Sequence, residues 1–107
     1  MITENGKYYL YRHIRLDKNE PFYIGIGTKK QYNTLNSKYN RALQKSSNRT
    51  KYWKNIVAKT DYRVEILLES DDYEFIKEKE IEFIALYGRK NLRKGPLVNL
   101  TDGGEGS

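Results

Sequence analysis

The sequence contains no cysteine, a single histidine and no long apolar run, and each of these features excludes a class of chemistry. Without cysteine, neither a disulfide framework nor a thiolate zinc site can form. His13 stands alone, which excludes a histidine metal centre and a histidine pair that shares acid and base roles. No segment has the length and apolarity of a transmembrane helix or a signal peptide. We therefore expect a soluble, cytoplasmic protein that has no membrane partner.

The chain is basic. Its 107 residues include 20 Lys and Arg against 14 Asp and Glu, which gives a formal net charge of +6 and a pI near 9.4. Such an excess favours a polyanion as partner, with nucleic acid as the first candidate. Ten tyrosines and one tryptophan suit that partner, although aromatic rings also build ordinary cores. At this length we expect one domain, residues 1–107, with one hydrophobic core.

Side-chain alternation predicts a β-hairpin near the start of the chain. Residues 7–15 are rich in β-forming residues, residues 17–20 form a turn, and a second strand runs from Pro21 through Ile26. A period of two places one set of side chains on one face: Tyr9, Tyr11, His13, Tyr23 and Gly25. It directs the other set toward a core: Leu10, Ile14, Phe22, Ile24 and Ile26. A third strand is expected at residues 62–69.

Three helices are expected. The first, residues 35–46, carries Lys38, Arg41 and Lys45 in a basic row along its flank. The second, residues 50–59, packs four side chains inward: Tyr52, Trp53, Ile56 and Val57. The third is the longest, begins at a Ser70 cap and ends at Gly88, and a loop follows it.

The longest helix contains an acidic residue at an inward position. Glu80 falls in the middle of an apolar stripe formed by Tyr73, Ile76, Phe83, Ile84 and Tyr87. Burial of an unpaired carboxylate costs several kcal/mol. Glu80 therefore needs a buried Arg or Lys, a hydrogen-bond network, or a cleft in which a ligand cation reaches it.

Five short motifs follow one another in an informative order. They are YLY at 9–11, YIG at 23–25, Arg41 on the next predicted helix, Glu80 in EIEFI, and Asn99 in LVNLTDGGEG. Each motif is weak alone, but the ordered set resembles the GIY-YIG nuclease superfamily over most of the chain. The likeness is greatest to the catalytic domains of phage and group I intron homing endonucleases. One departure is Tyr9, which replaces the glycine of GIY.

The resemblance implies an α/β (α+β) domain in which helices flank a three-stranded antiparallel sheet. It also implies an endonuclease that hydrolyses phosphodiester bonds in double-stranded DNA, with Mg²⁺ or Mn²⁺ and without a small-molecule cofactor. Relatives of this kind often continue into separate DNA-binding modules. The Gly-rich residues 101–107 are then either a linker to such a region or the end of a standalone nuclease.

The resemblance also implies roles for individual residues. Tyr11 takes a proton from the attacking water, Tyr23 lines the phosphate, and Gly25 allows a close approach of the backbone. Because an unperturbed tyrosine has a pKa of about 10, the Tyr11 phenolate needs a nearby positive charge. Lys45 is the candidate for that charge, at a position where relatives often carry a histidine.

The remaining implied roles concern the phosphate and the metal. Arg41 holds the scissile phosphate, with Arg49 as the competing candidate and Lys38 as a further substrate contact. Glu80 binds the metal, and water and phosphate oxygens fill its other positions. Asn99 hydrogen-bonds the backbone near the site.

Two other classes of function fit the same composition. A noncatalytic nucleic-acid binding module would keep the basic row and the tyrosines but would have no use for an inward carboxylate. A protein-interaction domain with incidental charge would bind DNA without a steep dependence on salt.

Overall fold

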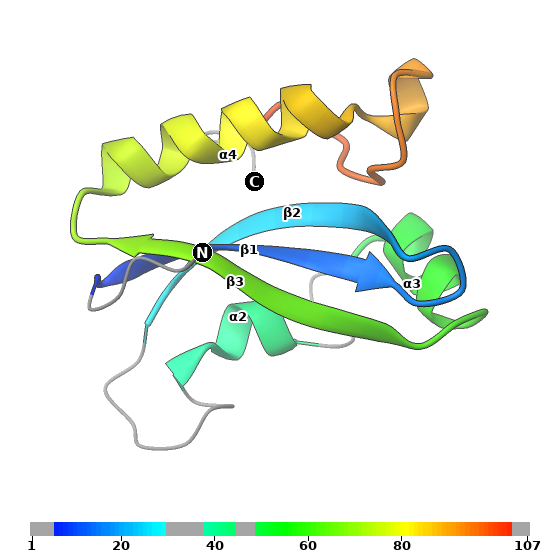
Figure 1. Ribbon diagram of the computed structural model, residues 1–107, viewed down its shortest axis with the longest axis horizontal. Coiled ribbons are helices and arrows are strands. Elements are labelled where there is room, and N and C mark those ends of the chain that lie inside the picture. Colours follow the sequence, from blue (N-terminus) through cyan, green and yellow to red (C-terminus); the bar gives the residue numbers. More distant parts are fainter. Residues whose placement is uncertain (1–5, 30–37, 45–48, 104–107) are drawn as a thin grey trace.

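The computed structural model describes residues 6–29, 38–44 and 49–103 of the chain (Figure 1). The elements, in order, are β1 (Tyr8–Arg15), β2 (Glu20–Thr28), α2 (Asn40–Leu43), α3 (Lys51–Val57), β3 (Tyr62–Ser70), α4 (Tyr73–Tyr87) and the 3₁₀ helix η1 (Lys90–Leu92). Across these residues, no helix combines the length and the apolarity needed to span a bilayer.

The three strands form one antiparallel sheet in the order β2-β1-β3, with β1 in the centre. Helices pack against this sheet, so the predicted α+β fold is confirmed. β2 continues to Thr28, and the prediction that it ends at Ile26 was wrong. Gly25 and Gly27 stay in the strand because they make room for tyrosines on β1. A Cβ atom on Gly25 would collide with the Tyr11 ring, and one on Gly27 with the ring of Tyr9.

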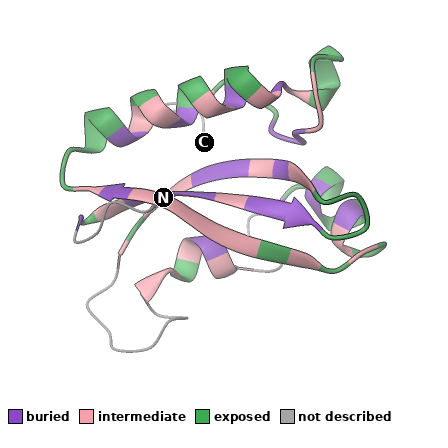
Figure 2. Cartoon of the chain, viewed as in Figure 1, coloured by how far each residue is buried: buried purple, intermediate pink, exposed green. Residues whose placement is uncertain are grey.

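Both faces of the sheet are covered. Figure 1 shows α4 along one face and α2 on the other, with α3 at the end where β2 begins. The core under α4 is aliphatic and consists of Leu10, Ile24, Ile84 and Leu97. The core on the opposite face is mostly aromatic and is built around Tyr9, Tyr11, Phe22 and Trp53. Figure 2 shows the buried residues concentrated on β1 and β2 and on the inner sides of the helices, whereas β3 is mostly of intermediate burial.

Phe22 packs on the face opposite to the one that alternation predicts. Its ring lies with Trp53 in the aromatic core, and not with Leu10 and Ile24. The cause is a β-bulge, because His13 pairs with Tyr23 whereas Ile14 pairs with Pro21. The extra residue on β2 breaks the period of two at that point.

The helix boundaries differ from the expected ones in a few places. α4 is capped by Asp72, whose carboxylate accepts a hydrogen bond from the Phe75 amide at 3.2 Å, while Ser70 is the last residue of β3. Gly88 ends α4 as predicted. Within the expected second helix, Tyr52 was predicted to pack inward, but it is 51% exposed. Residues 35–37 and Lys45, from the expected first helix, lie outside the described residues.

The chain after η1 returns to the outer edge of β2. The Val98 amide donates to the Phe22 carbonyl at 2.8 Å, and Asn99 bonds to the next outward-facing backbone groups, those of Ile24. This segment covers the edge as far as Ile24. The remainder of the strand borders the pocket described next.

Candidate active site

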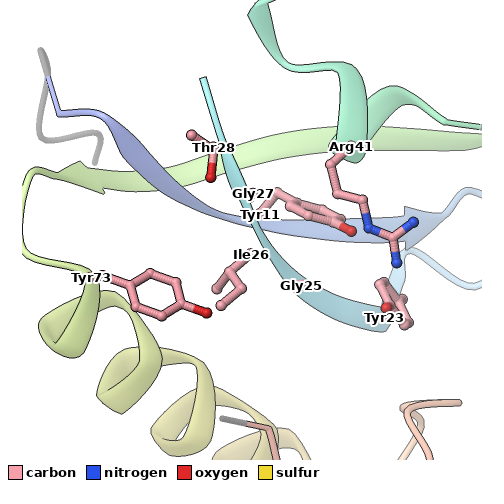
Figure 3. Close-up of a pocket in the computed structure, with 8 residues that line it drawn as sticks. All are labelled: Tyr11, Tyr23, Gly25, Ile26, Gly27, Thr28, Arg41 and Tyr73. Atoms are coloured by element: carbon pink, nitrogen blue, oxygen red, sulfur yellow. The ribbon is translucent and has the colours of Figure 1, made fainter. Parts of the chain in front are cut away.

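A pocket of about 170 Å³ lies beside the second half of β2 (Figure 3). Its lining residues are Tyr11, Tyr23, Gly25, Ile26, Gly27, Thr28, Arg41 and Tyr73. Four of them are site residues that the sequence predicted, contributed by β1, β2 and α2. Tyr73 and Thr28 were not predicted as site residues. The pocket therefore collects residues that are far apart in the sequence, including Tyr73 at the start of α4.

Tyr11 is buried at the base of this pocket beside its strand partner Gly25. Its hydroxyl oxygen accepts a hydrogen bond from Nη1 of Arg49 at 3.1 Å. Burial raises the pKa of Tyr11, the neighbouring Tyr23 raises it further, and the charge of Arg49 opposes both without overcoming them. Tyr11 is consequently a neutral phenol at neutral pH. Arg49 places a positive charge beside the Tyr11 hydroxyl, and Lys45, the residue to which the resemblance gives that charge, lies outside the described residues.

Arg49 is buried and connects the end of α2 to the aromatic core. Its Nε donates to the Gln44 carbonyl at 2.9 Å and its Nη2 to the Arg41 carbonyl at 2.6 Å. The guanidinium also lies 5.1 to 5.9 Å from the ring centroids of Tyr11, Tyr23 and Trp53. Through these contacts, Arg49 holds the backbone segment that carries Arg41.

Arg41 lies at the wall of the pocket, where Nη1 donates to Oε1 of Gln44 at 2.7 Å. Figure 3 shows its guanidinium directed toward Tyr23. Of the two arginines between which the sequence did not decide, Arg41 lines the pocket, whereas Arg49 is buried and is not among the lining residues. Lys38 precedes Arg41 by about one turn, is half-buried, and is not among the lining residues.

Glu80 has no exposed surface and lies between Ile76 and Ile84 on the inner side of α4. The predicted inward orientation is confirmed. Glu80 does not line the pocket itself. It follows Tyr73, which does, by seven residues, or about 10 Å along the helix axis. The structure thus brings the tyrosines and Arg41 together and places Glu80 farther along the adjoining helix.

Gly103 lies directly against the Glu80 carboxylate. A Cβ atom at this position would be 3.1 Å from Oε1 of Glu80, and the φ of +97° also suits glycine. Gly103 therefore covers one side of the buried Glu80 carboxylate.

The side chains fit one kind of divalent metal site. Within the described ranges, no three His, Cys, Asp or Glu residues gather into a cluster that could hold an ion. A cage made only of protein ligands is therefore not formed there. Mg²⁺, however, commonly binds one or two carboxylates and keeps several waters, and substrate phosphates supply further ligands. Glu80 supplies one carboxylate of the kind that such a site uses, but that carboxylate has no exposed surface and does not line the pocket.

Asn99 is buried and acts as a substitute strand partner for β2. Its side-chain amide donates to the Ile24 carbonyl at 2.8 Å, and its oxygen accepts from the Ile24 amide at 3.0 Å. Ile24 lies between Tyr23 and Gly25, so Asn99 fixes the part of β2 that carries two lining residues. The backbone hydrogen bonding expected of Asn99 is present in this form.

Replacing Asn99 with alanine is expected to lower the free energy of unfolding by about 1–3 kcal/mol, because both Ile24 backbone groups lose a buried partner. Urea unfolding measures the change. Asn55→Ala, at an exposed position on α3, is the matched control and should change stability by less than about 0.5 kcal/mol. Equal effects of the two substitutions would show that the Asn99 bonds do not stabilise β2.

His13 is a core residue. The indole nitrogen of Trp53 donates to Nδ1 at 2.9 Å, so Nε2 carries the proton and donates to the Ala42 carbonyl at 2.8 Å. Burial lowers the pKa of His13 to about 3, against the partial compensation of the Ala42 bond. His13 is therefore a strand histidine whose two ring nitrogens both have hydrogen-bond partners.

No protein-family model matches the chain, and neither the curated proteins nor the solved structures contain a match to it. The established result is the α+β fold with its β2-β1-β3 sheet. The likeness to GIY-YIG nucleases rests on the ordered motifs and stays a prediction.

Proposed function

We propose that this protein is a metal-dependent endonuclease that hydrolyses phosphodiester bonds in DNA, as the resemblance implies. The observation that carries the proposal is the pocket at the edge of β2, where Arg41 and the rings of Tyr11 and Tyr23 line one hollow. Tyr73, at the start of α4, lines the same pocket, and Glu80 is buried farther along that helix. A fixed cation, phenols and a carboxylate are the groups with which a protein holds a phosphate and a divalent metal.

The distribution of charge supports a polyanionic substrate. Residues 29–59 contain nine Lys and Arg and no Asp or Glu. Residues 88–103 contain four Lys and Arg and one acidic residue. The rest of the chain contains seven Lys and Arg against 13 Asp and Glu. The positive charge is therefore concentrated on the segments that contribute Arg41 and that run along β2.

Ion pairing strengthens this contrast. Several basic residues have a carboxylate partner: Arg12, Arg15, Lys29, Arg63, Lys77, Lys79 and Arg89. By comparison, Arg41, Lys51, Lys54 and Lys90 form no ion pair with any residue in the described part of the chain. Their charge is available to phosphates.

In the proposed reaction, Arg41 binds the scissile phosphate and offsets the charge that develops on its oxygens. Tyr23 lines the phosphate, and the neutral Tyr11 hydroxyl, whose oxygen already accepts from Arg49, donates a hydrogen bond to a phosphate oxygen. A water oxygen forms a bond to phosphorus while the bond from phosphorus to the leaving deoxyribose oxygen breaks; the attacking water loses its proton to solvent, and a solvent water protonates the leaving oxygen. Glu80 would hold Mg²⁺, which when bound lowers the pKa of a coordinated water and neutralises phosphate charge. The neutral state of Tyr11 is compatible with this division of roles.

Replacing Arg41 with alanine is expected to slow the Mg²⁺-dependent nicking of supercoiled plasmid by about 100-fold, because one preorganised charge at the phosphate is lost. The rate is measured by conversion of supercoiled to relaxed plasmid. Arg63→Ala, on the solvent-exposed side of β3, is the matched control and should keep the wild-type rate. Equal rates in the two variants would exclude Arg41 as the phosphate ligand.

A second function, a noncatalytic nucleic-acid binding module, is favoured by one observation. Glu80 has no exposed surface and does not line the pocket. This burial is compatible with a protein that only binds nucleic acid, because such a protein does not need a metal ion at the carboxylate. Such a module would bind plasmid with a steep salt dependence. Wild-type protein that is folded and binds plasmid, but does not nick it with Mg²⁺ any faster than with EDTA, would establish this function and reject the endonuclease.

A further inference from the structure

A second cavity, of about 370 Å³, lies between α3 and the segment that follows α4. Its lining residues are Tyr52, Lys90, Asn91, Val98 and Leu100. Figure 1 shows both elements at the end of the sheet where β2 begins. The ring of Tyr52 is 51% exposed, although an inward position was expected for it. The Tyr52 ring and the exposed side chain of Leu100 are thus open to a ligand, and the buried Val98 lies in the wall between them and the core.

The second cavity adjoins the same strand edge as the first pocket. Val98, in its wall, donates to the Phe22 carbonyl on the outer edge of β2. The first pocket is lined by the same strand from Tyr23 to Thr28, and Asn99, next to Val98, bonds this strand at Ile24. A linear ligand that follows the edge of β2 therefore passes both.

The charge around the second cavity matches a nucleic acid. Lys90 lines it, and Lys51 and Lys54 stand on α3 on either side of Tyr52 in the sequence. None of the three lysines forms an ion pair with any residue that the structure describes. Lys90 beside the exposed Tyr52 ring is the kind of combination with which proteins bind single strands, because the base stacks while a phosphate is neutralised.

A single strand fits this cavity better than a duplex does. In a duplex the base faces are stacked on one another, so they cannot reach the Tyr52 ring. Contacts to phosphates alone would require cations but no apolar hollow lined by Tyr52, Val98 and Leu100. An exposed aromatic ring and a lysine in the wall of one apolar cavity are explained by a ligand that offers a free base and a phosphate together.

We propose that this cavity binds an unpaired nucleobase stacked on Tyr52, in a strand that continues to the phosphate held by Arg41. The favoured substrate is then DNA with a single-stranded segment next to the cleaved bond, such as a flap or a splayed junction. The preference for a flap or a splayed junction as substrate rests on the proposed endonuclease function. The binding of an unpaired base by Tyr52 does not depend on that function.

The binding test uses a fluorescent 12-nucleotide oligothymidine and a duplex of the same length. Tyr52→Ala is expected to weaken the binding of oligothymidine about tenfold, the loss that accompanies removal of one base–aromatic stack, and that of duplex less than twofold. Tyr52→Phe keeps the ring and should bind like the wild type. Phe75→Ala removes an exposed aromatic ring from α4 and is the matched control, with no expected effect on either ligand.

The salt dependence distinguishes stacking from a general loss of structure. Because Tyr52 is not proposed to contact phosphate, the slope of log affinity against log salt for oligothymidine should be the same in wild type and Tyr52→Ala. Unchanged affinity of Tyr52→Ala for oligothymidine, or equal weakening for both ligands, would overturn the proposal. A wild-type dimer that Tyr52→Ala converts to monomer would assign the cavity to a second copy of the chain and would also overturn it.

The cleavage test separates this inference from the endonuclease proposal. With Mg²⁺, the wild type should cut a flap duplex at least about fivefold faster than a plain duplex, and Tyr52→Ala should lose this preference. Cleavage of both substrates at one rate by the wild type would overturn the substrate assignment while the endonuclease stands. No cleavage of any substrate would reject the endonuclease, and the oligothymidine titration would still decide whether Tyr52 binds a base.

Discussion

Glu80→Gln is expected to lower the rate of Mg²⁺-dependent plasmid nicking by at least about 1,000-fold. The metal supplies several kcal/mol of stabilisation to the transition state, and each 1.4 kcal/mol corresponds to a factor of ten. Glutamine has nearly the shape of glutamate but lacks its charge, so Mg²⁺ loses its proposed protein ligand while the packing between Ile76 and Ile84 is kept. The nicking rate is measured over a range of Mg²⁺ concentrations.

The matched control is Glu78→Gln, which removes the same charge from the exposed side of α4. It should nick plasmid at the wild-type rate. Thermal unfolding should show that Glu80→Gln is folded, so that its loss of activity is chemical. Comparable nicking by Glu80→Gln and Glu78→Gln would remove Glu80 from the catalytic site.

Acidification from pH 6.5 to pH 5.0 is expected to lower the free energy of unfolding by roughly 2 kcal/mol, because His13 takes up a proton only in the unfolded chain. In the folded protein, burial holds the pKa of His13 near 3, whereas the unfolded chain takes up a proton at its ordinary pKa of 6.5. The stability is fully present above pH 6.5 and falls by about 1.4 kcal/mol per pH unit below it, until the folded state is protonated near pH 3.

Urea unfolding at pH 6.5 and pH 5.0, followed by the fluorescence of the single, buried Trp53, measures this dependence. His13→Gln carries no titrating group and should show a slope that is smaller by about 1.4 kcal/mol per pH unit. Equal slopes in wild type and His13→Gln would mean that His13 titrates alike in the folded and unfolded chain, which contradicts its neutral buried state.

The sheet could be predicted from local pattern, but its irregular features could not. Alternation located all three strands because their side chains alternate between two buried layers. It misplaced Phe22, because the bulge opposite His13 and Ile14 arises from strand pairing and leaves no sign in either strand alone. It ended β2 too early, because the two glycines suggest a turn until the tyrosine rings that cross them are known.

Part of the candidate site was also predictable. Ordered motifs identified Tyr11, Tyr23, Gly25 and Arg41, which line one pocket, and helical periodicity identified the buried Glu80. Tertiary packing decided the rest. Tyr73 reaches the pocket only because α4 begins beside β2, which the sequence does not specify.

The two arginines illustrate the same limit. The sequence left Arg41 and Arg49 as competing candidates. Burial of one guanidinium among aromatic rings and carbonyl groups, which depends on the whole fold, distinguishes them.

The most direct test of the proposed centre is a crystal structure of the protein with Mn²⁺ and a DNA substrate. The account predicts an anomalous peak at the carboxylate of Glu80, with a DNA phosphate between that ion and the guanidinium of Arg41. Glu80 held in an ion pair with a lysine or arginine, with the phosphate bound elsewhere and no manganese at the carboxylate, would contradict it.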